Sequence, residues 1–415
     1  MTDSTQISTS GRCTWPGAVG IVLLFALCGM SVVAQPGGSP LAKRTAVKPS
    51  AAGAKRFELI PPAASGIEFV NRFAGLEFYK NTVAHNGAGV AVGDVNGDDL
   101  ADIYLCNIQG DNALYLNQGN FRFRLATQTA GVAEEDKMST GSVLADVDND
   151  GDKDLLVNGI QSGTRLFLND GSGGFQLSEK SGLDPAGTTS SLALADIDGD
   201  GDLDLYVAHY IDRMYLADPT TGFEYSKRDD QWFVTRINGE STLKPKWKGR
   251  FTVSDTGRVR ELPEADRLYL NNADGTFRDV SAEPMFIVNG ESRALASFRE
   301  WGLDVTFRDV NNDLLPDLYV CNDFANPDRF WINQGSGTFE LVTHHNIRHT
   351  SRSSMGVDFT DLNADGVPDF MLLDMLDPDR ARRLVQLEKE IPRSSRLLDW
   401  TYVPRFNRNV LMISQ

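Results

Sequence analysis

The sequence lacks the short motifs that mark most enzyme classes. Its 415 residues contain no Gly-x-Ser-x-Gly turn, no His-Glu-x-x-His pattern, no phosphate-binding Gly-rich loop and no Cys-x-x-Cys pair. Motif evidence is therefore missing for a serine hydrolase, a zinc protease, a nucleotide-binding enzyme and a thiol oxidoreductase. A dominant basic patch is also missing, and the net charge of −17 repels nucleic acid. We expect no nucleic-acid partner.

Long hydrophobic runs are absent except near the amino terminus. Residues 18–34 form an apolar run that follows Arg12 and ends at the small-residue site Val32-Val-Ala34, which is typical of a signal peptide. We therefore assign residues 1–34 to a signal peptide and expect an exported protein, either secreted, periplasmic or held at the cell surface. No membrane span is expected after leader cleavage; an uncleaved anchor is the alternative, because the run approaches the length of a span. Residues 35–56, rich in Pro, Gly, Ala, Ser and Lys, indicate a flexible linker.

Acidic residues, by contrast, are abundant and concentrated. Twenty of the 57 acidic residues lie in five nine-residue loops. The clearest loop runs from Asp196 to Asp204, with Asp at positions 1, 3, 5 and 9 and Gly201 at position 6, where a sharp turn needs a positive φ. Oxygen ligands at odd positions, with the backbone carbonyl of position 7, suit a hard cation such as Ca²⁺. The loop is not an EF-hand, because Val207 occupies the position of the bidentate Glu.

The five loops predict up to five calcium ions, one in each loop. The predicted ligands are the side chains at positions 1, 3, 5 and 9, namely Asp94, Asn96, Asp98, Asp102, Asp146, Asp148, Asp150, Asp154, Asp196, Asp198, Asp200, Asp204, Asp309, Asn311, Asp313, Asp317, Asp361, Asn363, Asp365 and Asp369. The loops start 52, 50, 113 and 52 residues apart. A period near fifty with strand signals indicates a propeller or a solenoid.

A β-hairpin signal follows four of the loops. Its copies begin with Leu114-Tyr-Leu-Asn117, Leu166-Phe-Leu-Asn169, Leu268-Tyr-Leu-Asn271 and Phe330-Trp-Ile-Asn333. Each copy has an apolar strand, an Asn/Gly turn and a second strand that starts at Phe. Each period then has four strands, with the acidic loop between the first two. The predicted fold class is all-β, a β-propeller of four-stranded antiparallel blades.

The acidic loops and these hairpins together resemble the FG-GAP/VCBS repeats found in the calcium-bearing propeller of integrin α chains. The run Ser354-Met-Gly-Val-Asp-Phe-Thr-Asp361 and the following Leu373-Asp-Met-Leu376 resemble the cartilage acidic protein family and its bacterial relatives. The resemblance covers about residues 57–415 and implies a propeller over that range. Members of that family often carry an ASPIC/UnbV segment, which this sequence lacks, and the resemblance implies little about the ligand.

The number of repeats does not decide how the ring of blades closes. The last residues, Asn409 to Gln415, align with the first hairpin strand of the other repeats, so blade five lacks an outer strand. The segment from Phe57 to Ile60 resembles an outer strand, and its pairing with Val410 to Ile413 would close a five-bladed ring. The alternative is a longer ring, of seven blades as the family resemblance suggests. We favour the longer ring, because Gln415 falls where a turn and a strand should follow.

The loops are not equivalent. Position 6 is Gly in three of them but Asp99 in the first and Leu314 in the fourth. Asp tolerates a left-handed conformation, whereas Leu has a steric penalty there. The loop that starts at Asp309 also has only three carboxylates among its four ligand positions. We predict that it binds calcium most weakly.

Cysteine is scarce. Once the leader is removed, only Cys106 and Cys321 remain, at equivalent places in blades one and four. Equivalent positions in non-adjacent blades lie too far apart for a disulfide, whose Cα atoms approach within about 7 Å. We predict two buried free thiols. In the absence of a disulfide, we expect bound calcium to stabilise each blade.

Two excursions interrupt the repeats. The first, about residues 212–265 in blade three, carries aromatic and basic side chains, namely Phe223, Tyr225, Trp232, Phe233, Trp247 and Phe251 with Lys244, Lys246, Lys248 and Arg250. A loop of this composition on a rigid scaffold suits a binding surface; the alternative is a small satellite hairpin that covers its own apolar side chains. The second, about residues 377–407, opens with Asp377-Pro378, which predicts a helix start.

Two function classes remain. The first is a calcium-binding propeller that acts as an adhesion module for an extracellular protein or glycan, with calcium in a structural role. The second is a calcium-dependent polysaccharide lyase or hydrolase on the same scaffold. The first is favoured, because a fold alone supplies no chemistry and no catalytic residue set is visible. An unassigned carboxylate, Lys or Tyr with a strongly perturbed pKa in a cleft near the propeller axis would favour the second.

Overall fold

The computed structural model describes residues 58–75, 83–254, 257–323, 326–343, 347, 349–375, 405–406 and 410–413. The chain divides into two compact units, Met1–Leu59 and Ile60–Gln415, and all described strands belong to the second. The predicted signal peptide (1–34) and linker (35–56) lie outside the described residues, as does most of the predicted helical excursion (377–407). No helix in the described part of the chain is long and apolar enough to cross a membrane.

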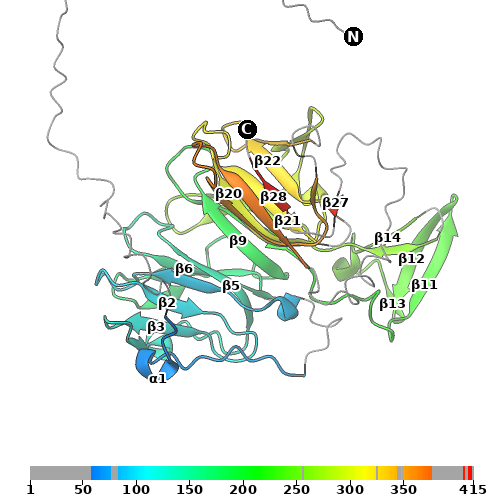
Figure 1. Cartoon of the computed structure of the whole chain (residues 1–415). Coiled ribbons are helices and arrows are strands. Elements are labelled where there is room, and N and C mark those ends of the chain that lie inside the picture. Colours follow the sequence, from blue (N-terminus) through cyan, green and yellow to red (C-terminus); the bar gives the residue numbers. More distant parts are fainter. Residues whose placement is uncertain are drawn as a thin grey trace, which may run out of the picture. The chain divides into compact units, whose positions relative to one another are not determined.

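Four-stranded antiparallel sheets built on the acidic loops form the first three blades (Figure 1). Blade one comprises β1 (Val90–Gly93), β2 (Asp102–Leu105), β3 (Ala113–Asn117) and β4 (Phe123–Leu125). Blade two comprises β5 (Met138–Ala145), β6 (Asp154–Ile160), β7 (Thr164–Asn169) and β8 (Phe175–Leu177). Blade three comprises β9 (Thr189–Ala195), β10 (Asp204–His209), β16 (Arg267–Asn271) and β17 (Phe277–Asp279). The predicted all-β fold with four-stranded blades is confirmed.

Blades four and five depart from four strands. Blade four comprises β20 (Gly302–Arg308), β21 (Asp317–Asn322), β22 (Arg329–Asn333) and β23 (Phe339–Leu341), extended by β18 (Phe286–Val288) and β19 (Glu291–Arg293). Strand β18 runs parallel to β23, so this hairpin covers the outer edge of blade four, which the sequence analysis did not predict. Blade five comprises β25 (Ser354–Thr360), β26 (Asp369–Asp374) and β28 (Val410–Met412).

The closure of the ring stays a prediction. Phe57 lies outside the described residues, and residues 58–60 form no strand. Among the described strands, β28 pairs with β26 alone. Blade five therefore has three described strands. The last of them, β28, pairs with β26 as the first hairpin strand of the other blades pairs with the second strand.

The blades stack in chain order, because the first strand of each contacts the first strand of the next from β1 through β5, β9 and β20 to β25. A separate cluster of buried side chains fills each interface between neighbouring blades. In β6, Leu155 packs with Tyr104 of blade one and Leu156 packs with Leu205 of blade three, since successive side chains of a strand point to opposite faces. Full burial of a leucine contributes about 1.5–3 kcal/mol. A single repeat lacks these interfaces, so its stability depends on the stack.

Both remaining cysteines lie in this core. Cys106 and Cys321 are buried and free, which confirms the prediction. Burial raises the pKa of the Cys106 thiol to about 11, so the group is protonated and unreactive at neutral pH.

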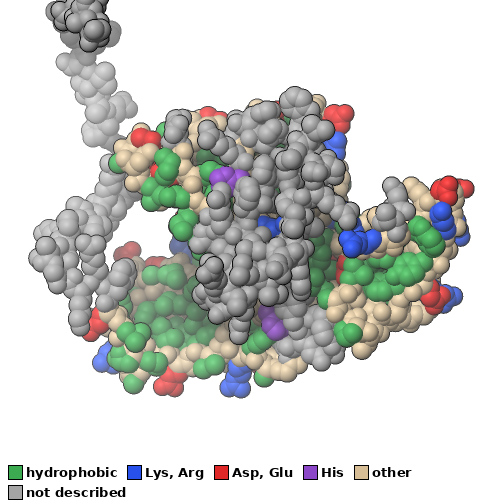
Figure 2. All heavy atoms as spheres, turned by 45° about the vertical axis from the view of Figure 1, so that its right-hand side comes forward, with side chains coloured by type: hydrophobic (Ala, Val, Ile, Leu, Met, Phe, Trp, Pro, Cys, Tyr) green, Lys and Arg blue, Asp and Glu red, His purple; other side chains and the backbone are tan. Residues whose placement is uncertain are grey.

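The insertion in blade three forms a small sheet and a hairpin of its own (Figure 1). The sheet comprises β11 (Phe223–Arg228), β12 (Gln231–Ile237) and β13 (Glu240–Ser241), and the hairpin comprises β14 (Phe251–Val253) and β15 (Val259–Glu261). Trp247 is buried, with ring centroids 5.0 Å from Tyr215 and 6.1 Å from Phe251. Tyr225 and Phe233 remain 45% exposed, and Figure 2 shows hydrophobic side chains along this sheet with charged ones at its edges. The insertion thus covers part of its aromatic set and presents the rest to solvent.

The remaining elements are short. They are α1 (Pro62–Ser65), η2 (Val83–Asn86), α2 (Thr127–Ala130), η3 (Pro245–Trp247) and η4 (Leu295–Ser297), together with the parallel pair β24 (Thr350–Ser351) and β27 (Arg405–Phe406). Val83 and Ala84 of η2 are buried against Tyr210 and Trp301. This contact closes the core at the end of the blades opposite the acidic loops.

Candidate metal centres

Every predicted ligand lies in a loop that joins the first and second strands of its blade. The loop 146–154 connects β5 to β6, and the loop 196–204 connects β9 to β10. In all five loops the ninth residue begins the second strand. The five loops therefore lie at the same end of their sheets.

Two residues in each loop have a positive φ, which winds the backbone tightly. At position 6 the angles are 65° for Asp99, 98° for Gly151, 98° for Gly201, 71° for Leu314 and 89° for Gly366. The predicted turn at position 6 is confirmed, and Leu314 carries a penalty of about 1–2 kcal/mol there. Position 4 also has a positive φ in all five loops, at Gly97, Asn149, Gly199, Asn312 and Ala364. The sequence analysis missed position 4, although Gly or Asn in four of the five loops is a recognisable signal.

Backbone N–H groups fix the carboxylates of each loop. In all five loops the position-1 carboxylate accepts a hydrogen bond from the N–H of position 6, and the position-5 carboxylate accepts one from position 7. In the third loop these bonds are 3.1 Å from Gly201 N to Asp196 Oδ2 and 3.0 Å from Asp202 N to Asp200 Oδ1. The ligand positions are therefore oriented by the chain itself.

The position-9 carboxylate connects the loop to the hairpin of its blade. Asp204 accepts the N–H of Ile197 at 3.0 Å and the N–H of Asn271 at 2.9 Å. The Asn271 side chain then donates at 2.9 Å to the carbonyl of Val147, which lies in the acidic loop of the preceding blade. Asn169 and Asn333 make the equivalent bond. The sequence analysis treated these asparagines as turn residues, and nothing in their local pattern shows the contact between blades.

Two of the five loops bring three carboxylates together. The groups are Asp146, Asp148 and Asp154 in the second loop and Asp196, Asp198 and Asp204 in the third, each with ligand oxygens within 4.8 Å of one another. Asp146 Oδ1 and Asp198 Oδ1 are buried and have no hydrogen-bond partner. No ion pair between described residues involves a carboxylate of these loops. Convergent carboxylates with unpartnered buried oxygens are unfavourable alone and could hold a hard cation such as Ca²⁺.

The other three loops differ at position 3, where Asn replaces Asp. The Nδ2 groups of Asn96, Asn311 and Asn363 donate to the position-5 carboxylate at 3.2, 2.8 and 2.8 Å. Among the residues that the structure describes, these loops contain no group of three converging carboxylates. The structure therefore divides the twenty predicted ligands into two acidic sites and three sites in which an amide replaces one carboxylate.

The pKa values follow this division at position 3 but not at position 9. At position 9, burial raises the pKa of Asp154 to about 6, that of Asp204 to about 7 and that of Asp317, whose loop has Asn at position 3, to about 6. Burial and then the charge of Asp200 raise the pKa of Asp198. In the first loop burial also acts on Asp94, but four backbone N–H donors outweigh it and lower the pKa. The carboxylates of the second and third loops should therefore gain more free energy from a bound cation than those of the other loops.

Comparison with known proteins agrees with this repeat structure. The FG-GAP-like repeat family matches residues 94–157, 146–207 and 309–372. Cartilage acidic protein 1 of Mus musculus is 35% identical over 82 residues, which is 20% of this chain and 13% of that protein. The Homo sapiens protein is 34% identical over 82 residues, 20% of this chain and 12% of that protein. The match thus spans a small fraction of the length of these relatives.

Several solved structures are similar over most of the chain. A lectin of Agrocybe aegerita that recognises non-reducing terminal N-acetylglucosamine covers 68% of this chain and 73% of its own, at 15% identity and a TM-score of 0.28. The V. cholerae biofilm matrix protein Bap1 covers 71% and 66%, at 11% identity and a TM-score of 0.28. The rhamnogalacturonan lyase YesW covers 69% and 55%, at 12% identity and a TM-score of 0.30. The chain carries FG-GAP-like repeats on propeller blades and is similar, over 82 residues, to cartilage acidic protein 1.

Proposed function

We propose that this protein is a secreted or surface-held calcium-binding β-propeller that acts as an adhesion module for an extracellular protein or glycan. The observation that carries the proposal is the pair of acidic groups in the second and third loops, whose buried oxygens Asp146 Oδ1 and Asp198 Oδ1 have no partner. Repeated oxygen ligands in tightly wound loops are what calcium uses in proteins.

Calcium has a structural role in this proposal. All twenty loop residues named above are its proposed ligands, up to five ions in all, and the two acidic loops bind most tightly. The ligands lie in turns between adjacent strands, so a bound ion offsets like charges and holds a blade together. Residues 1–34 serve as the leader, 35–56 as a linker and 57–415 as the propeller.

The favoured class is binding rather than catalysis. A cavity of about 590 Å³ opens where the first strands of the blades begin, and its described lining includes a single carboxylate, that of Asp304. Burial raises the pKa of Asp304. Both of its oxygens already accept hydrogen bonds, from Ser191 Oγ and from Val357 N, each at 3.2 Å. Because most glycoside hydrolases need two carboxylates, this cavity supports the hydrolase alternative poorly.

Calorimetric titration tests the calcium sites. Metal-free protein titrated with CaCl₂ should show binding with Kd of about 10⁻⁴–10⁻³ M, the range of extracellular modules. Asp198→Asn should weaken the tightest phase, whereas Asp170→Asn, an exposed carboxylate outside the loops, should leave it unchanged. Absence of heat above the MgCl₂ control would contradict the calcium proposal. The adhesion role is tested separately, by calcium-dependent binding of the full chain to glycan and matrix-protein arrays.

A further inference from the structure

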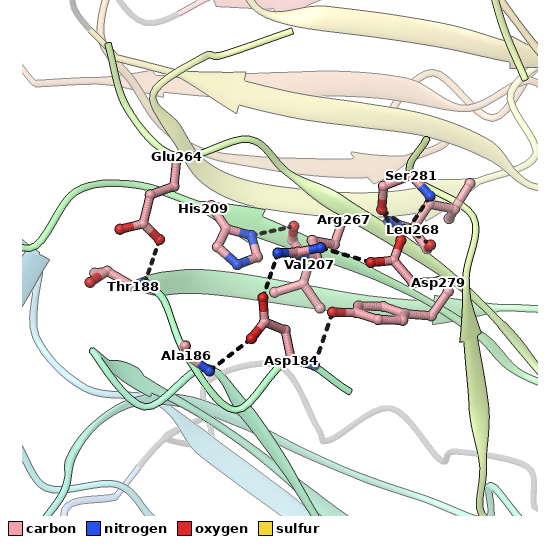
Figure 3. Close-up of polar contacts among 11 residues, drawn as sticks. Asp184, Ala186, Thr188, Val207, His209, Glu264, Arg267, Leu268, Asp279 and Ser281 are labelled. Atoms are coloured by element: carbon pink, nitrogen blue, oxygen red, sulfur yellow. Dashed lines mark hydrogen bonds and ion pairs between the residues drawn. The ribbon is translucent and has the colours of Figure 1, made fainter. Parts of the chain in front are cut away.

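A second, chemically different pocket lies in blade three, at the end opposite the acidic loops. Strand β10 begins at Asp204 in the acidic loop and ends at His209, which lines a cavity of about 280 Å³. The other walls come from the loop after β8 and from residues 264–267, where the insertion returns to the blade. Arg299, just after η4, also lines the cavity. Figure 3 shows His209 and Glu264 with Asp184 and Arg267.

His209 presents a hydrogen-bond acceptor to this cavity. Its side chain is 3% exposed, and its Nδ1 lies 3.2 Å from the carbonyl of Val207, so Nδ1 carries the proton and donates. Burial lowers the pKa of His209 to about 4, so the ring is neutral at pH 7. The other nitrogen, Nε2, has no partner among the described residues. Gly187, which also lines the cavity, lies beside it: a Cβ at Gly187 would be 3.5 Å from Nε2.

Two further groups on the cavity wall have unused hydrogen-bonding capacity. Glu264 accepts the N–H of Thr188 at 2.9 Å through Oε2, and no described residue bonds to its Oε1. Arg299 donates to the carbonyl of Pro263 at 3.3 Å and pairs with no carboxylate of the described residues. The cavity therefore offers two acceptors and one strong donor.

The other charged groups of the pocket already have partners. Arg267 pairs with Asp184 and donates to Asp279 at 2.7 Å (Figure 3). Asp266 accepts the hydroxyl of Tyr206 at 2.7 Å and the N–H of His209 at 2.7 Å. These bonds hold the walls in place and leave the first three groups for a ligand.

We propose that this pocket binds one neutral sugar unit through His209, Glu264 and Arg299. Sugar hydroxyls donate and accept at once, so adjacent hydroxyls can satisfy the two acceptors and the donor together. Three carboxylates and two guanidinium groups line the cavity, which disfavours an acidic sugar, and Arg299 disfavours an ammonium group. The proposal rests on the proposed function, since it names the glycan arm of that adhesion role.

Blade three differs from blades one and two in the turn between its second and third strands. The turn between the second and third strands is short in blades one and two, from Leu105 to Ala113 and from Ile160 to Thr164. In blade three the insertion occupies this turn, and its last residues bring Glu264 and Asp266 into the pocket. The insertion thus supplies Glu264 to this pocket, whereas the polar pocket beside the corresponding turn of blade one is lined by other residues, among them Asn107, Asp111 and Asn112.

The test uses the full chain with 5 mM CaCl₂ and a panel of neutral methyl glycosides, with glucuronate and glucosamine as charged analogues, measured by saturation-transfer NMR and calorimetry. Glu264→Gln and Arg299→Gln should each weaken binding of the best neutral glycoside by about tenfold or more, because each removes a charge-assisted hydrogen bond. The matched changes Glu291→Gln and Arg293→Gln, in the exposed β19, should have no effect. Ala296→Phe, at the cavity wall, should abolish binding by filling the space.

The proposal is overturned if no neutral glycoside binds the wild type, if the pocket variants bind as the wild type does, or if a charged analogue binds more tightly. Release of products from a bound oligosaccharide would also overturn it, in favour of a catalytic site. Melting in calcium and in EGTA is measured on the same samples. A normal calcium response with no sugar binding would reject this pocket while leaving the calcium-binding module intact.

Discussion

Replacing Asp198 by Asn should stabilise the metal-free protein and destabilise the calcium-loaded one. Asp198 Oδ1 is buried without a partner, and its carboxylate converges with those of Asp196 and Asp204. Asn is the natural residue at this position in three other loops, where its amide donates to the position-5 carboxylate, as Asn311 does to Asp313 at 2.8 Å. The substitution therefore removes a repelling charge and can add a hydrogen bond, but it also removes a calcium ligand.

The magnitudes follow from the geometry. The ligand oxygens lie within 4.8 Å of one another, and two unit charges at this separation repel by about 1 kcal/mol in water and about 3.5 kcal/mol at an effective dielectric constant of 20. Because Asp198 is only partly buried and solvent screens it, we expect a gain of about 1–2 kcal/mol in EGTA. With calcium at a hundred times Kd, a bound ion stabilises by about 2.7 kcal/mol, and the variant should lose most of this contribution from one loop.

The assay is thermal or urea unfolding of wild type and variant in EGTA and in 10 mM CaCl₂ at constant ionic strength. Asp170→Asn is the control, because its carboxylate lies in an exposed turn outside the loops and its effect should be the same in both buffers. A shift of the same sign in both buffers for Asp198→Asn would refute the reasoning, since it would show that this carboxylate does not face a cation.

Three further outcomes are expected. Asn271→Ala should destabilise by about 1–3 kcal/mol in unfolding assays, because it leaves a buried carbonyl without its donor, whereas exposed Asn272→Ala should be near neutral. In EGTA, stability should rise by about 1–2 kcal/mol as pH falls from 8 to 6.5, because Asp204 and Asp266, with pKa values raised to about 7 by burial, take up protons when folded but not when unfolded; this stabilisation is complete below pH 3.8 and is lost as pH rises through 7. A flat profile would contradict that assignment. In calcium, Asp200→Ala should lower the melting temperature more than Asp313→Ala, whose loop already carries the strained Leu314; equal shifts would reject this ranking.

The repeat could be predicted from the sequence because the residues that define each blade lie close together in the chain. The ligand spacing located all five loops between first and second strands, and Gly201 at position 6 predicted the positive φ that the structure has at 98°. Such features depend on neighbours in the chain, which a sequence displays directly.

The remaining features depend on residues that are distant in sequence. Asn271 looks like a turn residue, yet it bonds to Val147, 124 residues away. Strand β18 precedes blade four in the chain but pairs beside its last strand, β23. The pocket of His209 and Glu264 exists only because the insertion folds back to the blade it left. Spacing within a motif carries no signal for contacts of this kind.

The hairpin asparagine also explains why calcium and blade stacking are connected. In blade three, the N–H of Asn271 bonds to Asp204, a member of the acidic group, and its amide bridges the carbonyl of Leu203 and that of Val147 in the previous loop. A cation that holds Asp204 ionised and in place therefore also holds Asn271, and through it the loop of blade two. A metal site that stabilised only its own loop would need no such contact, since the hairpin turn could use Gly or Asp at this position. The Asn of blades two, three and four thus makes the metal loops of blades one to four part of the interfaces between neighbouring blades, which a single repeat cannot supply for itself.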